Sequence, residues 1–102
     1  MYKVMLGVRV ERLITTFQKA TQAKYERLRI LLVNYGPNLG MPHSRRLTNN
    51  LYELRIRGTQ EVRFFYTTKQ ENILIFYGFI KKTEKIPKKE IEIAYKILNE
   101  IT

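Results

Sequence analysis

Cationic side chains with aromatic neighbours are the residues of this sequence that could do chemistry. Five lysines fall within nine positions, directly after the apolar run "ILIFYGFI". They are Lys81, Lys82, Lys85, Lys88 and Lys89. Upstream, "LYELRIR" and "EVRFFY" carry Arg55, Arg57 and Arg63 at alternating positions. Cations bind phosphates and aromatic rings stack on unpaired bases, so this combination is typical of a surface for single-stranded nucleic acid.

The residue types that are missing narrow the possible reactions. The chain has no Asp and no Cys, and its nine Glu show no metal-ligand spacing, so we expect no metal site and no other cofactor. His43 is the single histidine and is interpreted as an ordinary surface residue. An enzyme built from this chain would work with Arg, Lys and Tyr. RNA suits such a site because its 2′-OH supplies the nucleophile, Arg can stabilise charge on the phosphoryl oxygens, and Lys or Tyr can assist proton transfer.

The net charge of the chain also favours nucleic acid as the partner. Among 102 residues, 19 are Lys or Arg and nine are acidic, which gives a formal net charge of +10. Such a surplus attracts polyanions, nucleic acid before membrane. No apolar stretch is long enough to span a bilayer, and the N-terminus lacks the layout of a signal peptide. We therefore expect one soluble, cytoplasmic domain over residues 1–102 that does not bind membranes.

The elements that must position these cations can be inferred from periodicity. Apolar spacing from Val10 to Tyr35 predicts two helices with a break near Lys19 to Thr21, and Gly36 and Pro37 end the second. The opening "MYKVMLGV" offers at most a brief strand. The following Gly- and Pro-rich segment is expected to be a loop, with a short extended piece at Ser44 to Leu47.

The second half of the chain alternates with a period of two. "LYELRIR", "EVRFFYT" and "ILIFYGFI" predict three strands in an antiparallel meander, with Val62, Phe64 and Tyr66 on one face of the second. Helical spacing of Ile91, Ala94, Tyr95, Leu98 and Ile101 predicts a final amphipathic helix opened by Pro87. Ile86 cannot provide a side-chain N-cap, which should cost about 1 kcal/mol.

The predicted fold class is therefore α+β, with two N-terminal helices, a three- to four-stranded mainly antiparallel sheet and a C-terminal helix. We expect two layers, with the helices on one sheet face and the other face partly open. Arg55, Arg57 and Arg63 share one strand parity, and Lys81 continues the parity of Tyr77 and Phe79. If the pairing register allows, these side chains converge on the open face.

Each of these residues also has a plain structural interpretation. An Arg on the outer side of a strand is most often only solvated, Tyr77 and Phe79 are more often core residues, and a lysine run is most often a solvated turn. Their coincidence on one parity favours binding. Lys88 and Lys89 add to this because they lie in the first turn of the predicted helix, where backbone N–H groups favour phosphate.

Four segments resemble a known family in order and spacing. These are "YGPNLGMPHSRRL", "LYELRIRG", "EVRFFY" and "GFIKKTEKIPKKEIEIA", and the resemblance covers Ala23 to Leu98. They resemble the phage-derived HigB-like branch of the RelE toxin superfamily. The resemblance implies a RelE-like fold and the toxin of a type II toxin-antitoxin pair. Such a toxin is a metal-independent endoribonuclease that cuts mRNA, in many members on the ribosome, and thereby inhibits translation. The resemblance also implies neutralisation by a helix-turn-helix antitoxin, through which the complex can bind operator DNA.

The resemblance also implies site residues. The family's basic strand positions fall on Arg55 and Arg63, and its lysine pair falls on Lys81 and Lys82. Arg63 is expected to stabilise the phosphate in the transition state, with the other three binding flanking phosphates or assisting proton transfer. The expected wider RNA-binding set is Arg57, Arg45, Arg46, Tyr77, Phe79, Lys85, Lys88 and Lys89. A non-catalytic basic RNA- or DNA-binding module, or an inactivated toxin, remains the alternative.

Overall fold

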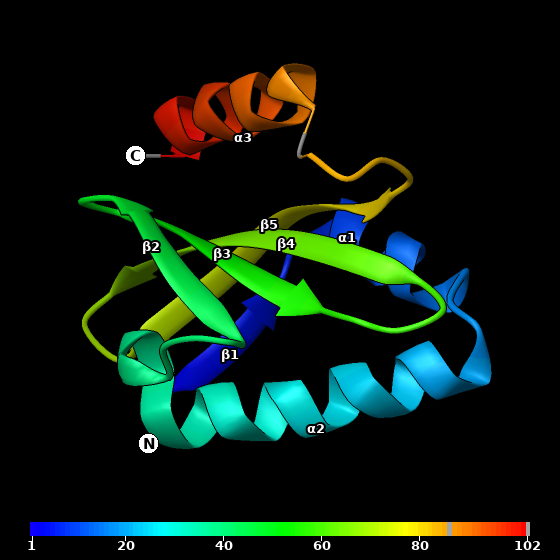
Figure 1. Cartoon of the computed structure of the whole chain (residues 1–102). Helices are drawn as coiled ribbons and strands as arrows, with labels where there is room; N and C mark the ends of the chain where they lie inside the picture. The colour runs from blue at the N-terminus through cyan, green and yellow to red at the C-terminus, as the bar shows by residue number, and fades with distance from the viewer. Residues whose placement is uncertain (86, 102) are drawn as a thin grey trace.

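The protein folds as a mixed sheet between helices (Figure 1). Its computed structural model describes residues 1–85 and 87–101, so the capping expectation for Ile86 lies outside the described residues. In chain order, the elements are β1 (Lys3–Leu6), α1 (Val8–Thr15), α2 (Lys19–Tyr35), a 3-10 turn (Gly36–Asn38), β2 (Ser44–Thr48), β3 (Leu51–Ile56), β4 (Glu61–Lys69), β5 (Asn72–Lys81) and α3 (Lys88–Ile101). The α+β class is confirmed.

Within the described part of the chain, the sheet has five strands in the order β1-β5-β4-β3-β2, one more than the largest expected number. β1 runs parallel to β5, pairing Lys3 with Asn72, and the other neighbours are antiparallel. The four residues of β1 are too few to show a clear period, which is why the sequence predicted only a brief strand there. The short extended piece expected near Ser44 is the edge strand β2.

Two helices cover the first face of the sheet. α1 ends at Thr15 and α2 begins at Lys19, so the break lies just before its expected position. Phe17 is buried in this link and anchors it to the core. Gly36 ends α2 with a positive φ of 56°, and a Cβ at this position would collide with the ring of Tyr2. This glycine is therefore required both by the backbone conformation and by close packing.

The main core lies between these helices and the sheet. The expected inward set Val62, Phe64 and Tyr66 is fully buried. Helix residues such as Leu28 and Leu32 pack in the same cluster. The hydroxyls of Tyr66 and Ser44 share a hydrogen bond of 2.8 Å, which satisfies the polar end of a buried ring and ties β2 to β4.

The second face is also covered in part, so the expected two layers are wrong and the fold has three. α3 lies on the side of the sheet opposite α2 (Figure 1). Its buried Ala94 and Leu98 belong to a second cluster with Leu51, Phe65, Phe76 and Phe79. A register shift between Phe65 and Tyr66 supplies an additional apolar residue of β5, Phe76, to this face. Tyr95 and Ile101, expected on the buried side of the helix, are 37% and 46% exposed.

The helices give no sign of a membrane-spanning element. None of those within residues 1–85 and 87–101 is both long enough and apolar enough to cross a bilayer.

Candidate nucleic-acid interface

Strand pairing brings the predicted cations together on the second face of the sheet. The register places Arg55 opposite Arg63, and Arg63 opposite Phe79, in one row across β3, β4 and β5. Lys81 lies opposite Glu61 at the neighbouring end of the sheet. The observed pairing register therefore lets these side chains converge, which the sequence alone could not decide.

The cations of this face differ greatly in exposure. The exposed fraction of the side chain is 64% for Arg57, 51% for Arg45, 19% for Arg55 and 1% for Arg63. Lys81 is half-buried. Further along, Lys82, Lys85, Lys88 and Lys89 are exposed. The positive charge that a phosphate can reach thus runs from β2 and the end of β3 toward the N-terminus of α3.

Arg63 lies beneath this surface. Its Nη1 donates to the Val62 carbonyl at 3.0 Å, and its Nη2 lies 3.5 Å from Oε1 of Glu61. Burial lowers the pKa of Arg63, and the nearby charge of Arg55 lowers it further, while the carboxylates oppose this. Its Nε is buried and has no hydrogen-bond partner among the residues that the structure describes. Direct contact between Arg63 and a phosphate requires a neighbouring side chain to move.

Glu53 was not among the predicted site residues and lies at the centre of the arginines. Its side chain is fully buried, with Oε1 at 3.5 Å from Nε of Arg55 and 3.8 Å from Nη2 of Arg45. Neither carboxylate oxygen has a hydrogen-bond partner among the described residues, so Glu53 interacts with these arginines through charge. Buried carboxylates are tolerated when they have a countercharge, and Glu53 in turn balances the charge of the arginines beside it. The alternation of "ELR" could have revealed it, because it places Glu53 on the same strand face as Arg55.

A second carboxylate organises the turn between β3 and β4. Oε2 of Glu61 accepts the N–H of Gly58 at 3.0 Å, and Oε1 lies 3.8 Å from Nε of Arg57. The Gly58 hydrogen bond is the largest cause of the lowered pKa of Glu61, and the charges of Arg63 and Arg57 add to it. The turn therefore holds Arg57 at the edge of the arginine row.

The predicted aromatic residues serve packing rather than an open stacking surface. Phe79 is 8% exposed and stacks on Phe65 with ring centroids 6.2 Å apart. Tyr77 is half-buried, and its hydroxyl donates to Oε1 of Glu90 in α3 at 2.8 Å. Desolvation, with the Glu90 hydrogen bond next, raises the pKa of Tyr77 to about 12. Both rings lie where they hold α3 on the sheet.

The two arginines of β2 lie on opposite faces. Arg45 pairs with Glu53 in the sheet and shares its face, whereas Arg46 pairs with Tyr52 and points to the other side. The guanidinium of Arg46 donates to the Thr48 carbonyl and to Oδ1 of Asn49, at 3.2 and 3.0 Å. Arg46 therefore stabilises the β2–β3 turn, and only Arg45 extends the arginine row.

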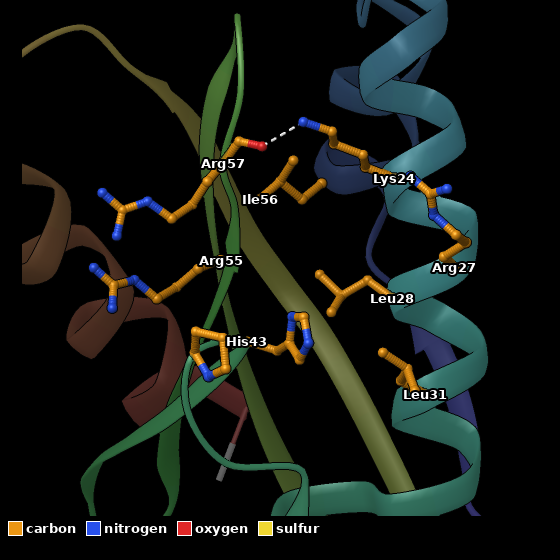
Figure 2. A pocket seen from close by; sticks show the side chains of 9 residues that line it. Lys24, Arg27, Leu28, Leu31, His43, Arg55, Ile56 and Arg57 are labelled. Atoms are coloured by element: carbon orange, nitrogen blue, oxygen red, sulfur yellow. Dashed lines mark hydrogen bonds between the residues drawn. The ribbon is translucent and has the colours of Figure 1, made fainter.

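A pocket of about 430 Å³ opens beside this row, between α2 and the end of β3 (Figure 2). Leu28, Leu31 and Ile56 contribute apolar surface, and Lys24 donates from α2 to the Arg57 carbonyl at 2.6 Å. His43 is exposed, as expected, and lines the pocket between β3 and α2. Arg55 and Arg57 also line it, but Figure 2 shows their guanidinium groups on the far side of β3.

The candidate site thus offers arginine and lysine charge organised by two carboxylates. Within the part of the chain that the structure describes, no group of three or more His, Cys, Asp or Glu side chains could hold a metal ion.

The family of the chain follows from comparison with known proteins. No curated protein matches it. The family described as "Phage derived protein Gp49-like (DUF891)" matches residues 12–99, which include α2, all of β2 to β5 and most of α3. The matched range therefore contains every residue of the candidate site. The chain belongs to the Gp49-like family of phage-derived proteins, a family associated with toxin-antitoxin systems.

Proposed function

We propose that this protein is the toxin of a type II toxin-antitoxin pair and acts as a cytoplasmic, metal-independent endoribonuclease of the HigB-like, RelE type. The observation that carries the proposal is the cross-strand pairing of Arg55 with Arg63, with Glu53 buried beside them, in a member of a toxin-associated family. Its substrate is mRNA on the ribosome, its effect is inhibition of translation, and its inhibitor is a helix-turn-helix antitoxin.

The chemistry follows from the groups available. The 2′-OH attacks the adjacent phosphorus, a 2′,3′-cyclic phosphate forms, and the bond to the 5′ oxygen breaks. The proton of the 2′-OH passes to water, and the 5′ oxygen gains one. Arg55 donates to the non-bridging oxygens, where charge develops in the transition state. Lys81 or Lys82 donates a proton to the leaving oxygen or binds the next phosphate.

The role of Arg63 differs from the phosphate contact that was expected from the sequence. Because its side chain is only 1% exposed, we assign the phosphate contact in the described arrangement to Arg55. Arg63 adds positive charge from the next strand and reaches the phosphate only if a neighbouring side chain moves. Arg45, Arg57 and the exposed lysines after Lys81 extend the footprint on RNA or ribosome by charge attraction.

Cleavage of a labelled mRNA tests the proposal, measured in EDTA on free RNA and, without EDTA, on ribosomes that keep their Mg²⁺. Arg55→Ala should lower the rate by at least about 100-fold, which is typical for loss of one donor to a developing negative charge. Arg12→Ala is the matched control, because Arg12 is exposed on α1, away from the row. An unchanged cleavage rate in Arg55→Ala would remove that residue from the catalytic role.

A non-catalytic RNA- or DNA-binding module, or an inactivated toxin, is the second candidate. The burial of Arg63 and the use of Tyr77 in the contact with α3 favour it, because the first withdraws a charge that could stabilise the transition state and the second a group that could transfer a proton. A binder of this kind would yield no cleavage products. Its affinity for single strands would fall with salt with a log-log slope of about −0.7 per phosphate contacted.

A further inference from the structure

The pocket beside β3 has no role in the cleavage chemistry described above. We propose that it is a nucleotide subsite, which takes one base of the RNA that flanks the cleaved position. This inference rests on the proposed function for the identity of the ligand. Its physical basis is the composition of the pocket and its position next to the arginine row.

The pocket forms because β3 extends beyond the end of its neighbour β2. Regular pairing between them reaches only Ser44 opposite Leu54, followed by one hydrogen bond of 2.8 Å from the Arg55 N–H to the His43 carbonyl. Beyond this point β2 no longer flanks β3, and α2 lies beside this end of β3 (Figure 2). The space left between them has the volume of about 430 Å³.

The walls of the pocket suit a flat, largely apolar group. Leu28 and Leu31 come from α2, Ile56 comes from β3, and His43 contributes an imidazole ring at the mouth. Leu31 is half-buried and His43 is exposed, so a ligand can reach both. A nucleobase fits such a site, because binding pockets are mostly apolar with a few polar groups that fix orientation.

Cations lie on both sides of the open edge. Lys24 and Arg27 line the pocket from α2, and Arg27 is exposed. On the other side of β3 are the guanidinium groups of Arg55 and Arg57 (Figure 2). Among the described residues that line the pocket, none is acidic. Phosphates placed before and after a base in the pocket would therefore both meet positive charge.

Continuity with the arginine row favours RNA over an acidic protein segment. Arg55 lines the pocket and also pairs with Arg63 in the row. A strand bound at Arg55 can pass over the edge of β3 that β2 leaves open and insert its neighbouring base. An acidic peptide would match the charge but would have no need of this connection to the row.

Titration of the ¹⁵N-labelled protein with AMP, GMP, CMP and UMP, followed by NMR, tests the subsite. These nucleotides have no internucleotide bond, so the result does not depend on cleavage. We expect the amide signals of Leu31, His43 and Ile56 to shift, with weak, millimolar affinity for at least one nucleotide. Inorganic phosphate and an amphipathic peptide of Glu and Leu serve as separate arms.

Two matched pairs of variants locate the binding. Arg27→Glu should weaken nucleotide affinity by about tenfold, since it replaces a phosphate contact by a repulsive charge, whereas Arg12→Glu on α1 should not. Leu31→Gln should weaken it as well, whereas Ile30→Gln, at a 52% exposed neighbour outside the pocket, should not. If Leu31→Gln loses its dispersed spectrum, the arginine pair decides the outcome.

Three results would overturn the subsite. They are no shift at the pocket amides, equal affinity for inorganic phosphate and for every nucleotide, or shifts with the acidic peptide alone. The first or third result together with mRNA cleavage would leave the proposed function intact. Nucleotide binding in the pocket without any cleavage of mRNA would instead support the subsite and count against the ribonuclease.

Discussion

Replacement of Glu53 by Gln tests whether the arginine row depends on its buried carboxylate. Glu53 is fully buried, and its Oε1 lies 3.5 Å from Arg55 and 3.8 Å from Arg45. Gln has nearly the same shape but no charge. In Glu53→Gln, Arg55 and its cross-strand neighbour Arg63 would therefore lie side by side without the carboxylate between β2 and β4.

The size of the effect can be worked out from these distances. Two unit charges 3.5 Å apart attract by about 5 kcal/mol at an effective dielectric constant of about 20. Removal of one partner from a buried pair typically costs about 3–5 kcal/mol. Because Arg45 is 51% exposed and Arg55 is 19% exposed, water can solvate both guanidinium groups and offset part of this free-energy cost. We expect a loss of roughly 2–3 kcal/mol in the free energy of unfolding, or a Tm lower by roughly 10–20 °C for a domain of this size.

Urea unfolding followed by circular dichroism measures this loss. The matched control is Glu26→Gln, because Glu26 also pairs with an arginine, Arg29 at 3.6 Å, but is 60% exposed. Exposed pairs contribute about 0.2–1 kcal/mol, so the control should remain close to the parent protein. If the two variants lost equal stability, the carboxylate of Glu53 would not be the countercharge that holds the row together.

Two further predictions concern titration. Burial raises the pKa of three tyrosines to about 12, namely Tyr25, Tyr66 and Tyr77. Their contribution to stability is complete below the ordinary tyrosine pKa of about 10 and is lost as the pH rises toward 12. Absorbance of tyrosinate should therefore show a late rise near pH 12 with the amplitude of three tyrosines, and in Tyr77→Phe with the amplitude of two. Loss of the hydrogen bond to Glu90 in this variant should speed amide exchange in α3. Since the pKa of Glu61 is lowered, chiefly by the Gly58 N–H, its contribution is present above the ordinary glutamate pKa of about 4.3 and is lost as the pH falls through the folded value. Urea midpoints should fall less steeply between pH 7 and pH 2 in Glu61→Gln than in the parent protein. The same fall in both proteins would contradict this prediction.

Local signals predicted most of the fold. Gly36 and Pro87 are close to the observed end of α2 and start of α3. Gly36 tolerates the positive φ that ends α2, and proline fixes its own φ near the helical value, so both signals are local. Alternation along β3 and β4 gave the correct inward face, including Val62 and Phe64. These features depend on neighbouring residues only, so a single sequence contains them.

Features that depend on distant segments were missed. β1 pairs with β5 across nearly the whole chain, and nothing in "KVML" reveals a parallel partner. The extra residue at Phe76 exists only in relation to β4, and it helps to create the apolar surface that α3 covers. Strand parity placed Arg63 on the correct face but could not give its depth, because burial is decided by the side chains on adjacent strands.

The parallel contact between β1 and β5 also constrains how the chain folds during synthesis. Lys3 pairs with Asn72, so the first strand cannot join the sheet until the last strand has left the ribosome. The β3–β4 hairpin closes over a much shorter loop and can assemble the Arg55 and Arg63 pair earlier. At a synthesis rate of about 5–20 residues per second, the apolar side of α2 would stay partly exposed for several seconds before the sheet is complete. Because this pairing has a high contact order, we expect the nascent protein to be most prone to aggregation just before β5 leaves the ribosome.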